Sequence, residues 1–317
     1  MNNVIFYSPN ALILAISKFG NSASYFEISQ DSLSARNQQR SNARLNAEIL
    51  KILGAKHRVL DLAEISKFLI HRDSSKWVIE MTIFGSLTNR NFERMRGSIQ
   101  ALHIGADPYL AKFTFKTLFS GRKSWVECIK WRRVFKDIPA SSLLLYESRN
   151  RINQLVRLPI EKVSFSQIQI AASKISGFKN NQGLSSFRDI ENQFVVFGVD
   201  ELEVHLEENK NLVKEVLKHL DISNCDVLIK PHPNYSGDLK AIVETIRKIL
   251  TGVRINKIQV VDKSVPLELM LYSQQCLYFF GVPSSALMAY PRNRFTLLNV
   301  VPSRRGMTKR SYLNAKI

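Results

Sequence analysis

Asp226-Val-Leu-Ile-Lys-Pro-His-Pro-Asn234 is the stretch that decides the fold class of this chain. Its apolar run from Val227 to Ile229 predicts a buried parallel strand. Lys-Pro-His-Pro then ends the strand, because proline lacks the N–H that a ladder needs and keeps the preceding residue extended. We therefore expect His232 on a stiff loop at the carboxyl end of a strand, the edge where open α/β sheets bind ligands.

Two further motifs follow in the C-terminal half. Val265-Pro-Leu-Glu268 places a carboxylate just after a predicted strand, and the apolar run at 276–280 leads into Gly281-Val-Pro-Ser-Ser285. Ser284 and Ser285 can cap a helix and offer hydroxyl and N–H groups to a phosphate. Each motif alone also fits an ordinary loop or helix start. Together, an imidazole, a carboxylate and paired serines after successive strands indicate a ligand site.

Strands and helices alternate along both halves of the chain, which predicts an α/β protein with two doubly wound, parallel sheets. The polar stretch 165–192 is the expected linker, so we predict Rossmann-like domains at 1–185 and 186–317. In the first half the expected strands are 4–7, 58–62, 77–84 and 142–146, with helices at 10–19, 41–53 and 92–100. In the second half we expect strands at 194–198, 227–229, 258–261, 277–280 and 295–300, with helices at 207–220, 238–250, 267–273 and 286–290.

The charge of the chain points to an anionic partner. Its 317 residues, enough for two hydrophobic cores, include 45 Lys and Arg against 27 Asp and Glu, a net charge of +18. Such a field attracts polyanions whatever their sequence. Zinc-finger spacings, an RNA-recognition strand and a helix-turn-helix are absent from the sequence. We therefore favour an acidic glycan acceptor or an anionic membrane surface over nucleic acid.

Several other classes of protein are disfavoured by missing patterns. Three scattered cysteines fit neither a disulfide framework nor a zinc site, and the six histidines show no metal-ligand spacing, so we expect no metal cofactor. Gly-x-Gly-x-x-Gly after the first strand, a Walker loop and Gly-x-Ser-x-Gly are also absent. Without a leader pattern or a long apolar run, we expect a cytoplasmic protein that can rest on the inner membrane.

The three C-terminal motifs resemble the His-Pro, Pro-x-Glu and Ser-Ser signatures of the bacterial GT-B sialyltransferases and polysialyltransferases. The N-terminal stretch from Val4 to Lys18, a strand, a Ser-Pro turn and an apolar helix, is similar to the start of many of these enzymes. The resemblance implies a GT-B architecture, in which two Rossmann-like domains face a cleft. It also implies a CMP-activated sialic acid as donor, a glycan or glycolipid as acceptor, and no metal.

The resemblance also implies catalytic roles. His232 would stabilise or protonate the departing CMP phosphate. The family's general base lies in a motif of two acidic residues and a glycine, and the best match here is Leu143-Leu-Leu-Tyr-Glu-Ser-Arg149. Glu147 survives in it, whereas Ser148 and Arg149 replace the second acid and the glycine. Asp107 is the weaker candidate for the base.

The nucleotide would be held by a second set of residues. By resemblance the serines bind the phosphate, the Pro-x-Glu carboxylate binds the ribose hydroxyls, and backbone near the two strand ends frames the cytosine. The expected nucleotide-binding residues are Gly198, Lys230, Pro231, Glu268, Ser284 and Ser285.

Two alternatives stay open. A transferase of similar architecture could use CMP-Kdo or a CDP-polyol, because such enzymes also pair a His-Pro loop with phosphate-binding serines. The altered acidic motif and the +18 charge also fit a non-catalytic protein that binds a nucleotide or a polyanion. Tight CMP binding without turnover of any CMP-sugar would favour the second alternative.

Overall fold

The computed structural model describes residues 2–33, 42–70, 76–81, 83, 98–102, 140–146, 158–176, 193–199, 222–231, 235–263, 265–271 and 276–280. At positions 66, 68, 70, 146, 176, 199, 268, 271, 277 and 278 the backbone alone is described. The chain divides into two compact units, Met1–Ala171 and Ala172–Ile317. Within the described ranges no helix is long and apolar enough to span a membrane.

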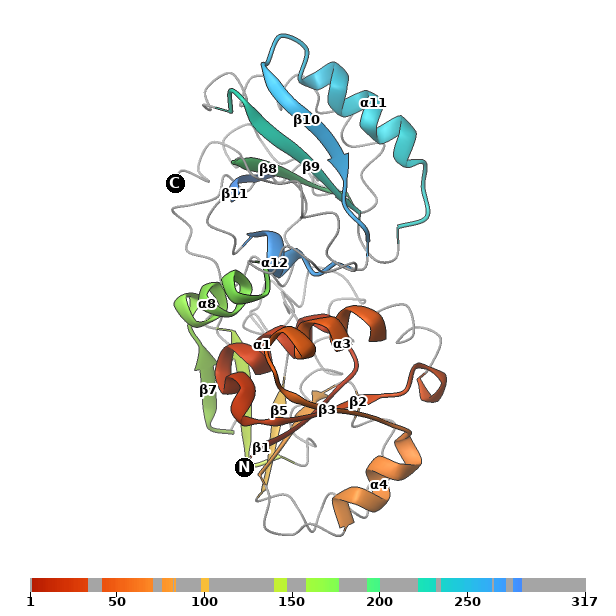
Figure 1. The fold of residues 1–317 in the computed structure, drawn as a ribbon, viewed down its shortest axis with the longest axis vertical. Helices are drawn as coiled ribbons and strands as arrows, with labels where there is room; N and C mark the ends of the chain where they lie inside the picture. The colour runs from red at the N-terminus through yellow and green to blue at the C-terminus, as the bar shows by residue number, and fades with distance from the viewer. Residues whose placement is uncertain are drawn as a thin grey trace, which may run out of the picture. The chain divides into compact units, whose positions relative to one another are not determined.

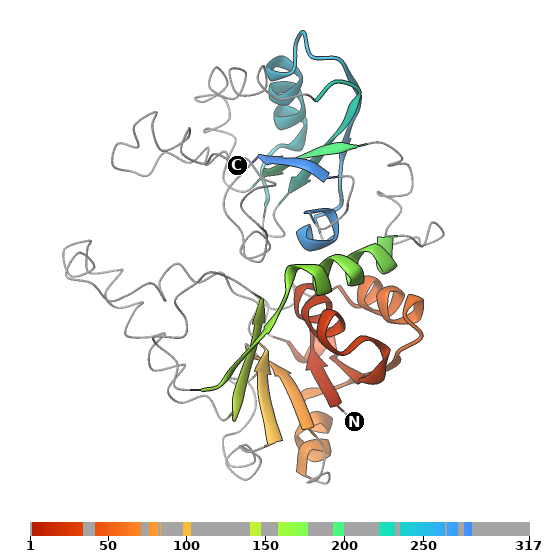
Figure 2. The ribbon, with the colours of Figure 1, turned by 90° about the vertical axis from the view of Figure 1, so that its left-hand side faces the viewer.

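The first unit is built on a seven-stranded sheet in which all neighbouring strands are parallel (Figure 1, Figure 2). The strand order is β3-β2-β1-β4-β5-β6-β7, and its first six strands follow the order of a Rossmann sheet. The order reverses between β1 and β4, so a ligand is expected beyond the carboxyl ends of these strands. The strands are β1 (Asn2–Phe6), β2 (Ser24–Ile28), β3 (Lys56–Leu60), β4 (Lys76–Glu80), β5 (Ile99–Leu102), β6 (Ser142–Tyr146) and β7 (Ile160–Val163).

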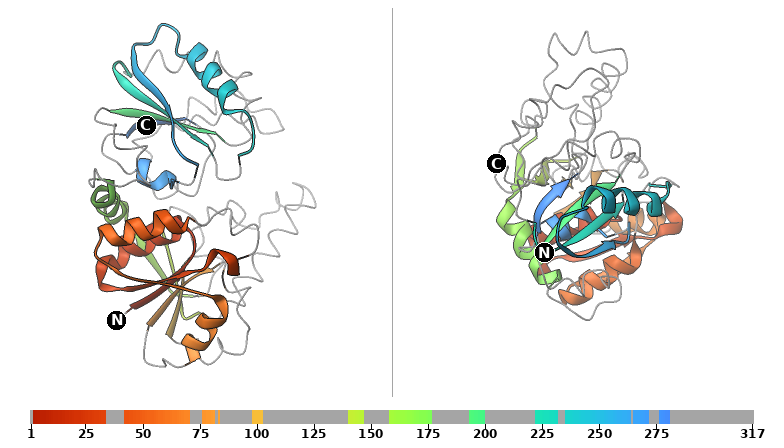
Figure 3. Two further views of the ribbon diagram at one scale, coloured as in Figure 1. Left: turned by 45° about the vertical axis from the view of Figure 1, so that its right-hand side comes forward. Right: turned by 90° about the horizontal axis from the view of Figure 1, so that it is seen from above.

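Helices cover both faces of this sheet. Figure 3 shows α1 (Pro9–Phe19) and α3 (Ala43–Ile52) on one face and α4 (Leu62–Ile70) on the other. Ser8 caps α1, Pro9 is its first residue, and Gly20 ends it at a φ of 57°, a value that favours glycine. A further helix described in this region is α8 (Phe165–Ser176), in which the division between the two units falls.

The core between the sheet and α4 is apolar and continuous. Ile65 and Leu69 of α4 pack with Ile5, Phe26 and Trp77 from three adjacent strands. Both faces of the sheet are buried, which explains why its central strands are nearly continuous apolar runs rather than alternating ones.

The second unit repeats the same winding on a smaller scale. Its sheet has the order β10-β9-β8-β11, again with parallel neighbours. If β8 is taken as the first strand of this sheet, the spatial order is 3-2-1-4. The strand order therefore reverses direction between β8 and β11. Helix α11 (Leu239–Ile249) buries Ile242, Ile246 and Ile249 against one face of this sheet. The other elements are β8 (Phe194–Val199), β9 (Cys225–Pro231), β10 (Ile255–Val260), α12 (Leu267–Leu271) and β11 (Cys276–Phe280).

The predicted fold class, α/β with parallel, doubly wound sheets, is confirmed, and several local predictions are wrong. The expected linker at 165–192 is helical over 165–176, because Ile168, Ala172 and Ile175 form a buried stripe at helical spacing. The prediction of a helix at 92–100 is wrong at its C-terminal end, because β5 begins at Ile99. The strand expected at 77–84 ends at Glu80, and β2, α4 and β7 were not predicted.

Other predicted features fall outside the described residues. These are the helices at 207–220 and 286–290, the strand at 295–300 and the domain boundary at 185/186. The boundary therefore stays a prediction.

Candidate functional site

The carboxyl ends of the parallel strands of the second unit share one edge of the sheet. β9 ends at Pro231 and β11 ends at Phe280. The next residue after β9 is His232, and the sequence after β11 leads to Ser284 and Ser285; all three lie outside the described residues. Because only β8 separates β9 from β11, the two motifs follow strands about 10 Å apart. The topology agrees with the predicted grouping of these motifs, and their distance from one another stays a prediction.

Lys230 lies at this edge with its side chain buried. It is 5% exposed and pairs in register with Gly198 of β8. Its ammonium donates hydrogen bonds to the carbonyl of Pro231 at 2.6 Å and to the carbonyl of Lys263 at 3.0 Å. The charged group is thus bound to backbone oxygens of two segments, the end of β9 and the turn after β10.

Glu268 is the second residue of the short helix α12. The helix is preceded by a turn in which the Val265 N–H donates to the carbonyl of Asp262 at 3.1 Å. The Leu269 N–H then donates to the carbonyl of Pro266 at 3.2 Å. The Pro-x-Glu motif follows the carboxyl end of β10. Because β10 runs parallel to β9, these bonds hold the backbone of the motif at the edge of the sheet where β9 also ends. The contacts of the Glu268 carboxylate lie outside the description.

Gly198 has a packing role at this edge. A Cβ atom placed on it would lie 2.7 Å from Cζ and 2.9 Å from Cε2 of the Phe279 ring, closer than real Cβ contacts. Phe279 is 1% exposed, so its ring has little room to move. Glycine at 198 therefore lets the Phe279 ring lie directly against β8. Contact of the Gly198 backbone with a nucleotide stays a prediction.

The two predicted base candidates follow neighbouring strands of the first unit. Glu147 is the next residue after Tyr146, where β6 ends, and Asp107 comes five residues after Leu102, where β5 ends. β5 and β6 pair in parallel, so both candidates follow the carboxyl edge of the first sheet. Both side chains lie outside the described residues, and their assignment stays a prediction.

A buried carboxylate that sequence reasoning missed lies at the reversal point of the first sheet. Glu80, 0% exposed at the end of β4, accepts hydrogen bonds from the N–H groups of Tyr7 at 2.9 Å and Ser8 at 3.2 Å. It also accepts one from the Ser8 hydroxyl at 2.8 Å. The same hydroxyl oxygen accepts from the Ala11 N–H and caps α1. Glu80 therefore fixes the turn from β1 into α1.

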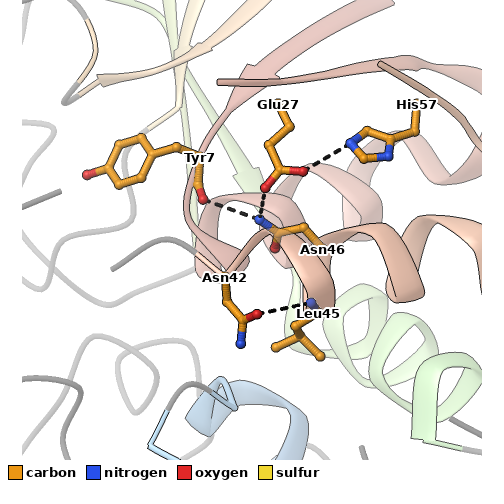
Figure 4. Close-up of polar contacts among 6 residues, drawn as sticks. All are labelled: Tyr7, Glu27, Asn42, Leu45, Asn46 and His57. Carbon is orange, nitrogen blue, oxygen red and sulfur yellow. Dashed lines mark hydrogen bonds and ion pairs between the residues drawn. The ribbon is translucent and has the colours of Figure 1, made fainter. Parts of the chain in front are cut away.

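A second buried network lies beside it, around Glu27 at the end of β2 (Figure 4). The Asn46 side-chain amide donates to Glu27 at 2.7 Å and to the carbonyl of Tyr7 at 3.3 Å. A ring nitrogen of His57 lies 3.1 Å from the other Glu27 oxygen. Both carboxylates are thus buried and hydrogen-bonded to neighbouring segments of the first unit. One sequence signal was available: each is an acidic residue inside an apolar strand.

Among the described residues, burial or ion pairing shifts the pKa values of three ionisable groups. Burial raises the pKa of the Cys276 thiol and that of the Tyr25 hydroxyl above their ordinary values. The hydrogen-bonded ion pair with Lys18 lowers the pKa of Glu161, and Gln100 adds a further hydrogen bond at 2.8 Å. Among the side chains that the structure describes, no group of three or more His, Cys, Asp or Glu is placed to hold a metal ion. None of these shifts concerns a predicted site residue.

Comparison with known proteins gives two matches that bear on this site. The model of the family described as alpha-2,8-polysialyltransferase (POLYST) matches residues 160–293, which is less than half of the chain but contains all three C-terminal motifs. The fold is similar to that of a sialyltransferase from Photobacterium damsela, with a TM-score of 0.50 at 10% identity over 98% of this chain and 76% of that one. The likeness to the solved structure shows a shared fold.

Other comparisons give weaker results. Staphylococcus aureus MnaA with UDP has a TM-score of 0.41 at 12% identity, over 88% of this chain and 73% of that one. Escherichia coli heptosyltransferase WaaC with ADP has a TM-score of 0.34 at 10% identity, over 91% and 84%. No curated protein sequence gives a significant match.

These findings agree with what the motifs indicated. The α/β fold with parallel, doubly wound sheets is that of the GT-B glycosyltransferases. The matched region begins at β7 and runs beyond β11, so it contains the edge at which His232, Glu268 and Ser284 were predicted to act. The resemblance to the bacterial sialyltransferases and polysialyltransferases is therefore confirmed, and the polysialyltransferase match at residues 160–293 carries it.

Proposed function

We propose that this chain is a glycosyltransferase that moves sialic acid, or a related acid sugar, from a CMP-activated donor to a glycan hydroxyl with inversion. The observation that carries the proposal is the polysialyltransferase match over residues 160–293. This region contains His232, Glu268 and the serine pair at 284–285, which follow β9, β10 and β11 in turn. Nucleotide sites at the carboxyl ends of parallel strands are the rule in open α/β sheets.

The donor would bind to the second unit. Ser284 and Ser285 offer hydroxyl and backbone N–H groups to the CMP phosphate, and Glu268 accepts hydrogen bonds from the ribose hydroxyls. His232 donates a proton or a hydrogen bond to the phosphate oxygen that leaves the anomeric carbon. Charge develops on this oxygen as the bond breaks, so a donor aimed at it lowers the barrier.

The acceptor would be activated by a carboxylate of the first unit. Glu147 takes the proton of the acceptor hydroxyl while the acceptor oxygen bonds to the anomeric carbon and CMP departs from the opposite face. The direct displacement explains inversion, and it needs the base and the leaving group on opposite sides of the sugar. The net charge of +18 favours an acceptor that is itself acidic.

The proposal is tested by a donor screen with purified protein. CMP-sialic acid, CMP-Kdo and a CDP-polyol are each incubated with acidic glycan acceptors, and release of the free nucleotide and of elongated glycan is measured. We expect acceptor-dependent CMP release from CMP-sialic acid. Turnover of one of the other donors alone would replace the proposed substrate, and CMP binding with no turnover of any donor would favour a non-catalytic binding protein.

A further inference from the structure

The backbone ladder between β9 and β10 ends just before the predicted catalytic loop. The last paired residues are Ile229 and Val260, and the Val261 N–H donates to the carbonyl of Ile229 at 2.8 Å. Beyond this point Pro231 has no N–H to donate, so the ladder cannot continue from that residue. A side chain can connect the end of β9 with the segment that follows β10 beyond this point.

The Lys230 ammonium makes this connection. Its bond to the carbonyl of Pro231, at 2.6 Å, fixes the peptide group that joins Pro231 to His232. Its bond to the carbonyl of Lys263, at 3.0 Å, holds the turn from Asp262 to Val265 that leads into α12. One buried side chain thus connects the backbone next to the predicted catalytic histidine with the turn before the helix of Glu268.

A buried lysine is costly unless its ammonium is hydrogen-bonded, and apolar residues occupy most positions of the same strand. A methionine in its place would fill a similar volume without the cost of burying a charge. The carbonyls of Pro231 and Lys263, which it binds, belong to the two motif segments. What the lysine offers over a methionine is therefore a fixed position of these two segments relative to one another. Placement errors of about 1 Å at a reacting centre can cost about 100-fold in rate.

We infer that Lys230 is a positioning residue that sets the geometry between the His-Pro loop and the Pro-x-Glu helix. The inference rests on the proposed function for its consequences in binding and catalysis. The connection itself rests on the described contacts alone. This role of the Lys230 side chain is separate from the predicted one, in which the backbone near Lys230 frames the base of the nucleotide.

Lys230→Met tests the inference, and Lys257→Met is the control for loss of a lysine that also stabilises the second unit, so that a general loss of stability can be told from a local one. Lys257 lies in β10 of the same sheet, at the opposite end, where its ammonium is 3.8 Å from Asp226. Hydrogen exchange is measured on peptides that cover 261–271 and 242–250 in the full chain, and CMP is titrated into each protein. For Lys230→Met we expect exchange in 261–271 to rise at least about tenfold, with 242–250 unchanged, because two hydrogen bonds to a charged group are lost.

CMP binding gives the second readout. We expect Lys230→Met to weaken CMP binding about tenfold or more, and Lys257→Met to leave it within about twofold of the wild type, since only Lys230 lies at the carboxyl edge. Should Lys230→Met fail to fold, Lys230→Gln carries the comparison: its amide is neutral and one bond shorter than the lysine side chain, so we expect a smaller change in the same direction in both readouts.

The outcomes separate this inference from the proposed function. Unchanged exchange in 261–271, or an equal rise in both peptides, would overturn the positioning role. Normal CMP binding by Lys230→Met would overturn it as well, while leaving the proposed function intact. Absence of CMP binding in the wild type would overturn the proposed function, and the exchange data alone would then decide whether Lys230 connects the two segments.

Discussion

Replacement of Glu80 by glutamine should destabilise the first unit by about 3 kcal/mol. The Glu80 carboxylate accepts from two buried N–H groups, of Tyr7 and Ser8, and from the Ser8 hydroxyl. In Glu80→Gln the amide can turn its carbonyl to the two N–H groups and its NH₂ to the hydroxyl oxygen. Three hydrogen bonds to a charged acceptor then become neutral ones, a loss of about 1 kcal/mol each. Glu80→Ala, which removes the acceptor of all three bonds, should cost more.

The assay is urea unfolding followed through tryptophan fluorescence, to which the buried Trp77 in the core of the first unit contributes together with Trp125 and Trp131. Glu64→Gln is the control, because Glu64 is 51% exposed and lies 3.9 Å from Arg58, a surface pair worth less than about 1 kcal/mol. A loss of about 3 kcal/mol is a large part of the 5–15 kcal/mol that stabilises a typical domain. If Glu80→Gln unfolds within about 0.5 kcal/mol of the wild type, the carboxylate does not hold the turn from β1 into α1.

Three further predictions concern the base and two ion pairs. Glu147→Gln should abolish transfer yet keep CMP binding within about threefold, because a base acts on the acceptor; retained transfer would move the base to another carboxylate. Lys257→Met should destabilise the second unit by about 1–2 kcal/mol, because it removes the ion-pair partner of the buried Asp226 carboxylate. In denaturant unfolding, the double variant with Asp226→Leu should recover most of this loss. Lys18→Met should cost less than about 1 kcal/mol at neutral pH, because the pair with Glu161 is partly exposed. The lowered pKa of Glu161 means that this contribution is present above the ordinary value of 4.5 and is lost on acidification, so unfolding curves of the two proteins should converge at low pH.

Much of the fold could be predicted where local signals agree. The apolar run at Val227–Ile229 and the proline after it placed β9, and the Ser-Pro turn with the apolar run that follows it placed α1. These signals are local in the chain, so they do not depend on which strands pair. Alternation of strand and helix then predicts parallel sheets in both units.

Two of the elements that sequence reasoning missed, β2 and α8, show why the prediction failed. β2 contains Glu27, whose buried carboxylate accepts a hydrogen bond from Asn46 of α3 and lies 3.1 Å from a ring nitrogen of His57 in β3. α8 was mistaken for a linker because glutamines and serines alternate with its apolar residues, although the spacing of Ile168, Ala172 and Ile175 is helical. In the first case the partners are distant in the sequence, and in the second the periodic signal was present but outweighed by composition.

The candidate site was predictable as a set of segments but not as a set of contacts. Motif order places His232, Glu268 and Ser284 after successive strands. The strands β9, β10 and β11 are described, and the grouping of the three side chains stays a prediction. The bond from Lys230 to the carbonyl of Lys263 joins residues 33 apart in sequence and depends on the pairing of β9 with β10. No local pattern could reveal it.

The central claim is tested most directly by transfer of sialic acid from CMP-sialic acid to an acidic glycan, measured for the wild type and for His232→Ala at equal concentration. We expect measurable transfer by the wild type and a rate at least about 100-fold lower for His232→Ala. Leaving-group stabilisation and general acid catalysis are each worth about 10²–10⁴ in rate. Urea unfolding of the variant should match the wild type, which shows that the loss is chemical. Near-wild-type transfer by a folded His232→Ala, or wild-type protein that binds CMP yet transfers from no CMP donor, would contradict the account.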